Sequence, residues 1–345
     1  MGFDRGELLR RLSAALGTAA FVRSASTDAQ AATTESWIAD LPSHPRWNFS
    51  FISHLTTSPL FVPLQYGIQD ACALGGCAYR WTGSASGDTG EVVKALHSAV
   101  KSKADGIAVP MIDAEALKRP VDDALRAGIP VVAYHAYGQL ASRALPFVGH
   151  DSYGAGVAVG RRIAGLVSSG DVTLLVAERG VPPVQGRLKG ALAGLRKFAP
   201  GVRAKVMSTT RDPYEVAARV ERQALESKKL RGLFALEFDS SEGIRYAIDK
   251  HDLHARGVRA GGYGVLPATL DLIREGKLDF TLDEQPYLQG FVPAVQLFLA
   301  RLSGGLVEPA DTELRLVFVT KANLGRYLAK TRYEGSSSKQ RYPIS

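Results

Sequence analysis

The sequence predicts an α/β protein built from two similar lobes, each with a parallel sheet like that of a Rossmann fold. Strand-like and helix-like segments alternate from Trp47 onward, and the same alternation restarts after His150. The strand segments are mostly apolar, as expected for parallel strands that helices cover on both faces. Two such series within about 240 residues exceed one ordinary sheet, so we expect two lobes.

The first series opens with a strand rich in aromatic and apolar residues. Asp113 is the expected N-cap of its third helix, and Ala127-Gly128 is the expected end of that helix. The predicted strands are 48–53, 77–82, 105–110, 129–134 and 145–149, and the predicted helices are 59–74, 89–101 and 114–126.

The second series repeats this pattern. Its predicted helices are 153–167, 184–198, 213–226 and 240–250, and its predicted strands are 172–177, 203–208, 232–236 and 258–262.

The most informative segment follows the second series. A short alternating run ending at Leu282 leads into three polar residues, and Pro286 then opens an apolar helix, because proline is tolerated in the first helical turn. Asp283, Glu284 and Gln285 are therefore expected where a strand ends and a helix begins. In open α/β sheets this is the usual position of a ligand.

The composition and net charge of the chain limit which classes of partner it is expected to bind. With 46% hydrophobic and 22% charged residues, the chain can bury ordinary cores. Its net charge of +8 could indicate nucleic acid or an anionic surface. The basic residues are spread along the chain, however, and no basic run reaches five residues. We therefore expect a solvated basic surface and no nucleic-acid binding.

Motifs of the common enzyme classes are absent from the sequence. It has no H-E-x-x-H, no G-x-S-x-G, no Walker loop, and no G-x-G-x-x-G after the first strand. Asp151 beside His150 is expected to cap the following helix rather than to join a catalytic triad. We expect no catalytic residues, no cofactor and no metal ion, and hence no enzyme.

The two cysteines are Cys72 and Cys77. Four intervening residues fit neither a zinc site nor a redox pair. The Gly75-Gly76 turn between them allows two interpretations: a small disulfide if the protein is exported, or two buried apolar side chains.

The N-terminus has features of an export signal. Arg5, Arg10 and Arg11 precede a short apolar run, and Ala29-Gln30-Ala31 suits cleavage. We expect a signal peptide over 1–31, a leader over 32–46 and a disordered tail over 331–345. A cytosolic amphipathic start is the alternative. No other stretch approaches the ~20 apolar residues of a membrane span.

Several motifs resemble those of type I periplasmic solute-binding proteins of the ribose-binding class. Similarity covers residues 47 to about 328, and within the class the chain is similar to actinobacterial sugar or polyol binders. The motifs are Thr56-Thr-Ser-Pro-Leu-Phe61, Cys77-Ala-Tyr-Arg-Trp-Thr-Gly-Ser84, Ala104-Asp-Gly-Ile-Ala-Val109, Ala127-Gly-Ile-Pro-Val-Val-Ala133 and Asp283-Glu-Gln-Pro-Tyr-Leu-Gln-Gly290.

This resemblance implies a fold, a division into lobes and a function. The lobes are expected to be 47–149 plus 285–312 and 150–284 plus 313–330, joined by a hinge of three crossings. An exported, monomeric receptor in the periplasm or on the outer face of the cell envelope would capture a sugar or polyol and deliver it to an ABC transporter permease. The alternative is a receptor subunit that reports a less sugar-like ligand to a signalling partner.

Four positions depart from the family pattern. Ser58, His135, Gly264 and Glu284 stand where asparagine, Asp or Asn, Asp, and glutamine are usual in the class. The chain has only two asparagines, Asn48 and Asn323. The pocket has therefore changed its ligand or lost tight binding, and the sequence does not identify the solute.

Candidate ligand residues follow from the chemistry of carbohydrates. Planar polar groups bind paired hydroxyls, and aromatic faces cover the C–H surfaces of the ring. Residues of these types that lie near predicted strand ends or match the family's contact positions are Ser58, Phe61, His135, Tyr137, Gln185, Glu237, Asp239, Tyr263, Glu284 and Gln285.

Overall fold

The computed structural model describes residues 42–137, 145–177, 181–223 and 227–328. From Arg46 onward, the described residues form one compact unit. The signal peptide and the C-terminal tail predicted from the sequence lie outside the described residues. In the part of the chain that is described, no helix is long and apolar enough to cross a membrane.

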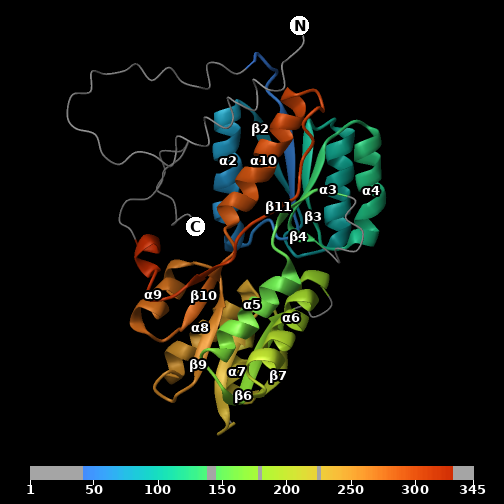
Figure 1. Cartoon of the computed structure of the whole chain (residues 1–345). Coiled ribbons are helices and arrows are strands. Elements are labelled where there is room, and N and C mark those ends of the chain that lie inside the picture. The colour runs from blue at the N-terminus through green and yellow to red at the C-terminus, as the bar shows by residue number, and fades with distance from the viewer. Residues whose placement is uncertain (1–41, 138–144, 178–180, 224–226, 329–345) are drawn as a thin grey trace, which may run out of the picture. The chain divides into compact units, whose positions relative to one another are not determined.

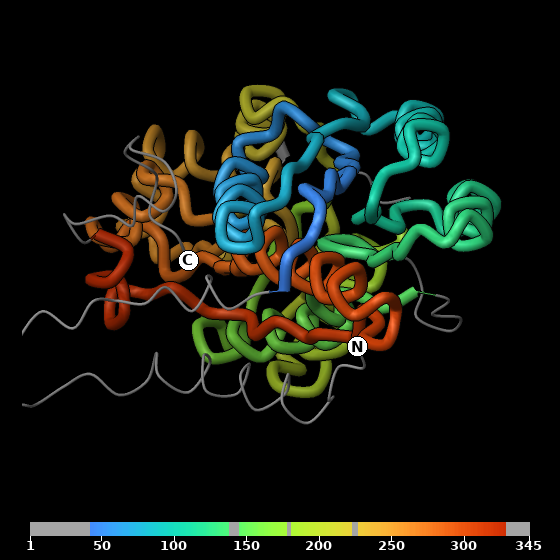
Figure 2. Tube along the Cα trace, turned by 90° about the horizontal axis from the view of Figure 1, so that it is seen from above, coloured from blue at the N-terminus to red at the C-terminus, as the bar shows by residue number. Residues whose placement is uncertain are grey.

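The N-terminal lobe contains a six-stranded sheet in the order β11-β5-β4-β3-β1-β2, and all of its strand pairs are parallel. α2 and α10 pack together on one face, while α3 and α4 cover the other (Figures 1 and 2). The strands are β1 (Asn48–Ser53), β2 (Ala78–Gly83), β3 (Gly106–Met111), β4 (Val131–Tyr137), β5 (Phe147–Gly149) and β11 (Thr312–Glu313). The helices are the 3-10 turn η3 (Pro59–Phe61), α2 (Val62–Gly75), α3 (Thr89–Lys101), α4 (Ala114–Arg126) and α10 (Pro286–Leu302).

Helix caps and one close approach explain how these helices are placed. Asp113 caps α4 as predicted, because its carboxylate accepts a hydrogen bond from the Ala116 amide at 3.0 Å. α2 and α10 touch backbone to backbone at Gly290, where a Cβ atom would lie 2.0 Å from the carbonyl oxygen of Leu64. Glycine at this position therefore brings α10, and with it the Pro286 junction, against the first lobe.

The C-terminal lobe repeats the arrangement with the order β12-β10-β9-β8-β6-β7, in which only β12 runs antiparallel to its neighbour. α5 and α6 cover one face, and α7, α8 and α9 cover the other (Figure 1). The strands are β6 (Ser169–Ala177), β7 (Gly201–Thr209), β8 (Leu230–Ala235), β9 (Arg259–Tyr263), β10 (Phe280–Asp283) and β12 (Val317–Val319). The helices are α5 (Ser152–Ala164), α6 (Pro182–Phe198), α7 (Pro213–Gln223), α8 (Phe238–His251), α9 (Pro267–Glu275) and the 3-10 turn η5 (Leu324–Tyr327).

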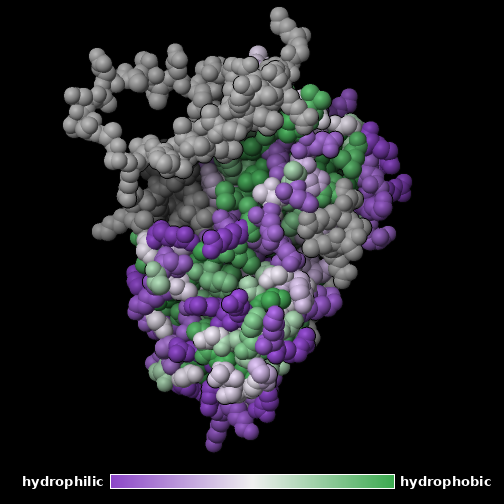
Figure 3. Space-filling model, in the orientation of Figure 1, coloured by the Kyte–Doolittle hydropathy of each residue, from purple (hydrophilic) through white to green (hydrophobic). Residues whose placement is uncertain are grey.

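These two parallel-sheet lobes confirm the predicted fold class. The chain passes between the sheets after β5, after β10 and after β11, which gives the three crossings expected of the hinge. The expected boundary between residues 312 and 313 falls within β11. On the face seen in Figure 3, hydrophilic side chains are spread over the described parts of both lobes and are dense over α3 and α4.

The cysteines lie at the C-terminal end of α2. Gly76 adopts a left-handed conformation with φ of 64°, and the Cys77 amide donates to the Cys72 carbonyl at 2.9 Å. This is a Schellman ending, which brings the side chains on either side of the glycine together. Both cysteines are buried free thiols in this structure.

Candidate functional site

A cleft of about 470 Å³ lies between the two lobes, at the carboxyl ends of the strands of both sheets. The N-terminal lobe contributes residues that follow β1, β2 and β3, together with the end of β4. The C-terminal lobe contributes residues that follow β6, β7 and β8. His150 and Glu284, in the first and second crossings, also line the cleft. A monosaccharide-sized solute fits such a space.

Five of the residues predicted from the sequence line this cleft: Ser58, His135, Glu237, Asp239 and Glu284. Of the other five, Phe61 and Tyr263 lie directly beneath cleft side chains. The ring centroid of Phe61 is 4.9 Å from that of His135, and the guanidinium carbon of Arg187 is 4.5 Å from the ring centroid of Tyr263.

The remaining three do not line the cleft. Tyr137 is buried in the core of the first lobe, with its ring centroid 5.3 Å from that of Phe147. Gln285 has a left-handed backbone, with φ of 53°, and its side-chain amide donates to the Arg315 carbonyl in the third crossing. Gln185 is half-buried on α6.

The second crossing and α6 form a buried ion pair that lines the cleft. Nη2 of Arg187 donates to Oε1 of Glu284 at 2.9 Å, and Nη1 donates to the Leu236 carbonyl at 2.7 Å. Burial opposes the charge of Arg187, but Tyr263, Glu284 and Glu237 outweigh it and raise the pKa of the guanidinium. Burial likewise opposes the charge of Glu284, but Arg187, His150 and His135 lower the pKa of its carboxyl group. Both groups are therefore charged at neutral pH.

Glu237 lines the cleft but is engaged by backbone amides. Its Oε1 accepts from the Ala177 amide and its Oε2 from the Ser240 amide, each at 3.0 Å. It thereby caps α8 and ties the end of β6 to that helix. Burial raises the pKa of its carboxyl group, although the two amides oppose this effect. The N-cap of α8 is therefore Glu237, and Asp239 lies in the first turn of that helix.

The N-terminal wall of the cleft carries two stacked imidazoles. The rings of His54 and His135 lie 5.6 Å apart at an interplanar angle of 22°, and the edge of Phe61 packs against both. Burial lowers the pKa of His54 to about 3 and also lowers the pKa of His135, so both rings are neutral at pH 7. Two neutral rings can each offer one donor and one acceptor.

The geometry at His135 also determines which nitrogen carries its proton. Its Nδ1 lies 2.8 Å from Oε1 of Gln289, whose amide nitrogen donates to the Glu284 carbonyl. Since Oε1 can only accept, Nδ1 of His135 is the donor and Nε2 is left as an acceptor. His135 is also held at φ of 61°, an unusual conformation for a residue with a Cβ atom and one that is common at functional sites.

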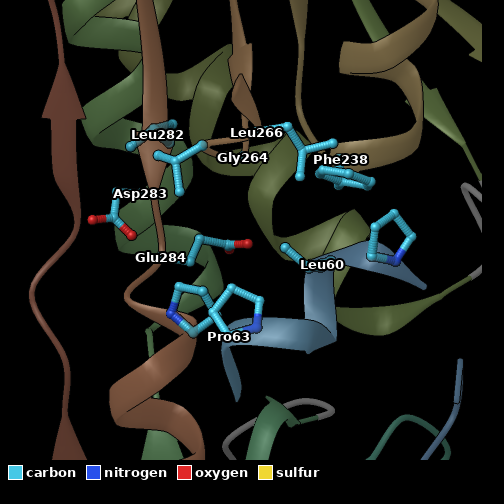
Figure 4. Close-up of a pocket in the computed structure, with 11 residues that line it drawn as sticks. Leu60, Pro63, Phe238, Gly264, Leu266, Leu282, Asp283 and Glu284 are labelled. Atoms are coloured by element: carbon cyan, nitrogen blue, oxygen red, sulfur yellow. The ribbon is translucent and has the colours of Figure 1, made fainter. Parts of the chain in front are cut away.

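Apolar contacts close the space beside the ion pair. Leu60 and Pro63 of the first lobe face Phe238 and Leu266 of the second, and the carboxylate of Glu284 points into the same space (Figure 4). Asp283 points the other way in that view. The free volume here is only about 30 Å³, close to that of one water molecule. A solute therefore fits the larger cleft and not this contact.

A further interlobe contact lies at the rim of the cleft. Arg211, which follows β7, donates to the Ser86 carbonyl in the loop after β2. The Ser84 hydroxyl fixes this loop by accepting hydrogen bonds from the amides of Ser86, Gly87 and Asp88 at 3.0–3.1 Å. The acceptor for Arg211 is thus held in place within the first lobe.

Comparison with known proteins agrees with this two-lobed architecture. Residues 49–304 match the family model described as "periplasmic binding protein domain". The chain belongs to this family. It is 39% identical over 319 residues to the xylose/arabinose-binding protein XylF of Sulfolobus acidocaldarius, which covers 86% of this chain and 77% of that protein.

Solved structures show the same fold. An ABC transporter solute-binding protein from Burkholderia graminis, in complex with D-arabinose, superposes with a TM-score of 0.75 at 20% identity over 83% of this chain and 99% of that one. A solute-binding protein from Actinobacillus succinogenes with bound D-allose gives 0.73 at 19% identity, covering 81% and 99%. Family membership confirms the predicted type I fold and the expectation of a binding protein rather than an enzyme.

Four residues that line the cleft were not expected from the sequence. These are His54, His150, Arg187 and Arg211. His54 could have been chosen from its position directly after β1. The pairing of Arg187 with Glu284, 97 residues later, has no signal in one sequence. Asp151 caps α5 as predicted, accepting from the Gly154 amide at 2.7 Å.

Proposed function

We propose that this protein is an extracytoplasmic substrate-binding protein that captures an uncharged sugar, a pentose in the first instance, and delivers it to an ABC importer. The observation that supports this most directly is a pair of buried polar atoms without partners. Among the residues that the structure describes, Nδ1 of His54 and Nε of Arg187 have no hydrogen-bond partner, and both side chains line the same cleft from opposite lobes. A solute that contacts both lobes could form hydrogen bonds with these atoms.

Charge in the cleft supports a neutral solute. Arg187 is paired with Glu284, Glu237 caps α8, and Arg211 is bonded to Ser86. An ionic solute would have to compete with these internal partners, whereas a polyhydroxylated solute can add hydrogen bonds to them. Neutral imidazoles on the opposite wall fit the same class of ligand. The first candidates are xylose, arabinose and allose. The name of the XylF relative includes xylose and arabinose, and the solved structures contain bound D-arabinose and D-allose.

We propose that the ligand is contacted by His135, Ser58, Glu237, Asp239 and Glu284, to which the structure leads us to add His54 and Arg187. Phe61 and Tyr263 support these side chains from beneath. The lobes are proposed to follow the boundaries expected from the sequence. Residues 1–31 are proposed to direct export, and the mature protein is proposed to be a monomer that interacts with a permease. The second candidate is a receptor subunit that reports a less sugar-like ligand to a signalling partner.

Calorimetry and thermal shift with D-xylose, L-arabinose, D-allose and the anion D-xylonate test the ligand class. A neutral sugar should raise the melting temperature of the folded protein, because it binds only that state. His54→Phe keeps the ring stacking but removes both nitrogens and should weaken binding about tenfold. His97→Phe, at an exposed position on α3, is the matched control. Tighter binding of D-xylonate than of every neutral sugar would contradict the proposal.

A further inference from the structure

One histidine ring contacts all three crossings of the hinge. His150 belongs to the first crossing and is 9% exposed. Its Nδ1 lies 2.6 Å from the carbonyl oxygen of Leu314 in the third crossing, and its Nε2 lies 2.7 Å from the carbonyl oxygen of Glu284 in the second. The Leu314 amide donates in turn to the Gly149 carbonyl at 2.8 Å. This ring and its neighbours therefore join the segments that must move when the lobes separate.

Both contacts of the ring are to acceptors, and this fixes its protonation state. A carbonyl oxygen cannot donate, and a neutral imidazole has only one N–H, so only an imidazolium satisfies both contacts. A neutral ring would place a nitrogen lone pair against a carbonyl oxygen at 2.6–2.7 Å. The amide nitrogen of Gln289, 3.4 Å from Nε2, already donates to the Glu284 carbonyl at 2.6 Å. It is a poorer partner for Nε2 than the carbonyl is.

The charged groups around this ring can accommodate a positive charge. The carboxylate of Glu284 is one counter-charge to His150, and it also interacts with Arg187 and His135. On the other side, His150 lines a second pocket of about 480 Å³ whose charged residues are Asp151, Glu313 and Arg315. These groups comprise three acidic side chains and two arginines. Their net charge is negative, so it does not oppose a proton on His150.

The same hydrogen bonds connect the hinge to the cleft. The Glu284 carbonyl that accepts from His150 also accepts from Gln289, and Oε1 of Gln289 holds His135. We propose that His150 is a positioning residue whose bound proton holds the three crossings together and so couples closure of the cleft to pH. Closure should become more favourable as pH falls, because only the protonated ring satisfies both carbonyl contacts. For sugar affinity, this inference rests on the proposed function.

Closure can be measured without any sugar. Spin labels at Lys118→Cys on α4 and Arg274→Cys on α9, both exposed side chains, report the distance between the lobes, while the native cysteines are buried. In the protein with native His150, the short-distance population should be larger at about pH 5 than at about pH 8. ¹⁵N-histidine NMR should show protons on both ring nitrogens of His150 at the lower pH. Identical distance distributions at the two pH values would overturn the proposal.

Variants separate this effect from ordinary destabilisation. His150→Gln should abolish the pH dependence of the distance, whereas His97→Gln, at an exposed position, should retain it. If His150→Gln retains the dependence, the proposal is wrong; if it does not fold, the measurement on native His150 still decides. Affinity for D-xylose should be about tenfold higher at the lower pH. A distance that responds to pH while none of the sugars binds would support the hinge proposal and refute the proposed function.

Discussion

Removing the carboxylate of Glu284 should destabilise the fold as well as weaken binding. The Arg187–Glu284 pair is almost fully enclosed, with side-chain exposures of 14% and 10%. In Glu284→Ala, Arg187 would keep its bond to the Leu236 carbonyl and its contact with the Tyr263 ring but lose its only ion-pair partner among the described residues. Breaking a buried pair by removing one member costs about 3–5 kcal/mol, because a charge is left without compensation. We expect a loss of about 3 kcal/mol at pH 7, since the guanidinium is not completely shielded from water.

Urea denaturation in a double-mutant cycle measures this loss. The variants are Glu284→Ala, Arg187→Met and the two combined, and the free energy of unfolding should recover largely in the double variant because no charge then remains unpaired. Asp122→Ala is the control, because it breaks the Lys118–Asp122 pair on the surface of α4 and should cost less than about 1 kcal/mol. If Glu284→Ala costs no more than this control, the pair does not behave as a buried ion pair and our description of this part of the cleft is refuted.

Three further predictions address other parts of the structure. Burial lowers the pKa of His54 in the folded protein to about 3, whereas its ordinary value in an unfolded chain is about 6.5. As pH falls below about 6.5, the unfolded chain therefore binds a proton that the folded protein does not. At pH 5 this should reduce the free energy of unfolding by about 2 kcal/mol. His54→Phe should remove that pH-dependent loss in urea melts, and identical pH profiles would contradict the assignment. Arg211→Ala should weaken sugar binding about fivefold in calorimetry by removing the rim bond to Ser86, and unchanged affinity would show that this contact does not aid closure. Gly290→Ala should cost about 3 kcal/mol in thermal melts, because its Cβ atom would meet the Leu64 carbonyl; a loss below about 1 kcal/mol would show that α2 and α10 can move apart.

Much of the fold could be predicted because its signals are local. Residues 48–53 and 89–101 form the strand and helix expected of them, and Pro286 opens α10 as its ring geometry requires. The helix Pro267–Glu275 and the strand Thr312–Glu313 were not predicted. With nine and two residues, they are too short to show a clear period.

The candidate site depends on conformations that one sequence does not show. Gln285 was placed beside Glu284 as a ligand residue, but its left-handed backbone directs its amide to Arg315 instead. Tyr137 follows His135 by two residues, and the register of β4 shifts nearby, leaving the tyrosine ring in the core. His135 and His54 meet although 81 positions separate them. Sequence reasoning thus located the strand ends, whereas contacts between distant segments determine which side chains face the cleft.

In the proposed function, the two lobes close around a neutral sugar at this cleft. Small-angle X-ray scattering with D-xylose or L-arabinose, at a concentration that calorimetry shows to be saturating, tests it most directly. Hinge closure brings the lobes together, so the radius of gyration should be smaller with the bound sugar than without it. A radius unchanged by a sugar whose binding has been demonstrated would contradict the account.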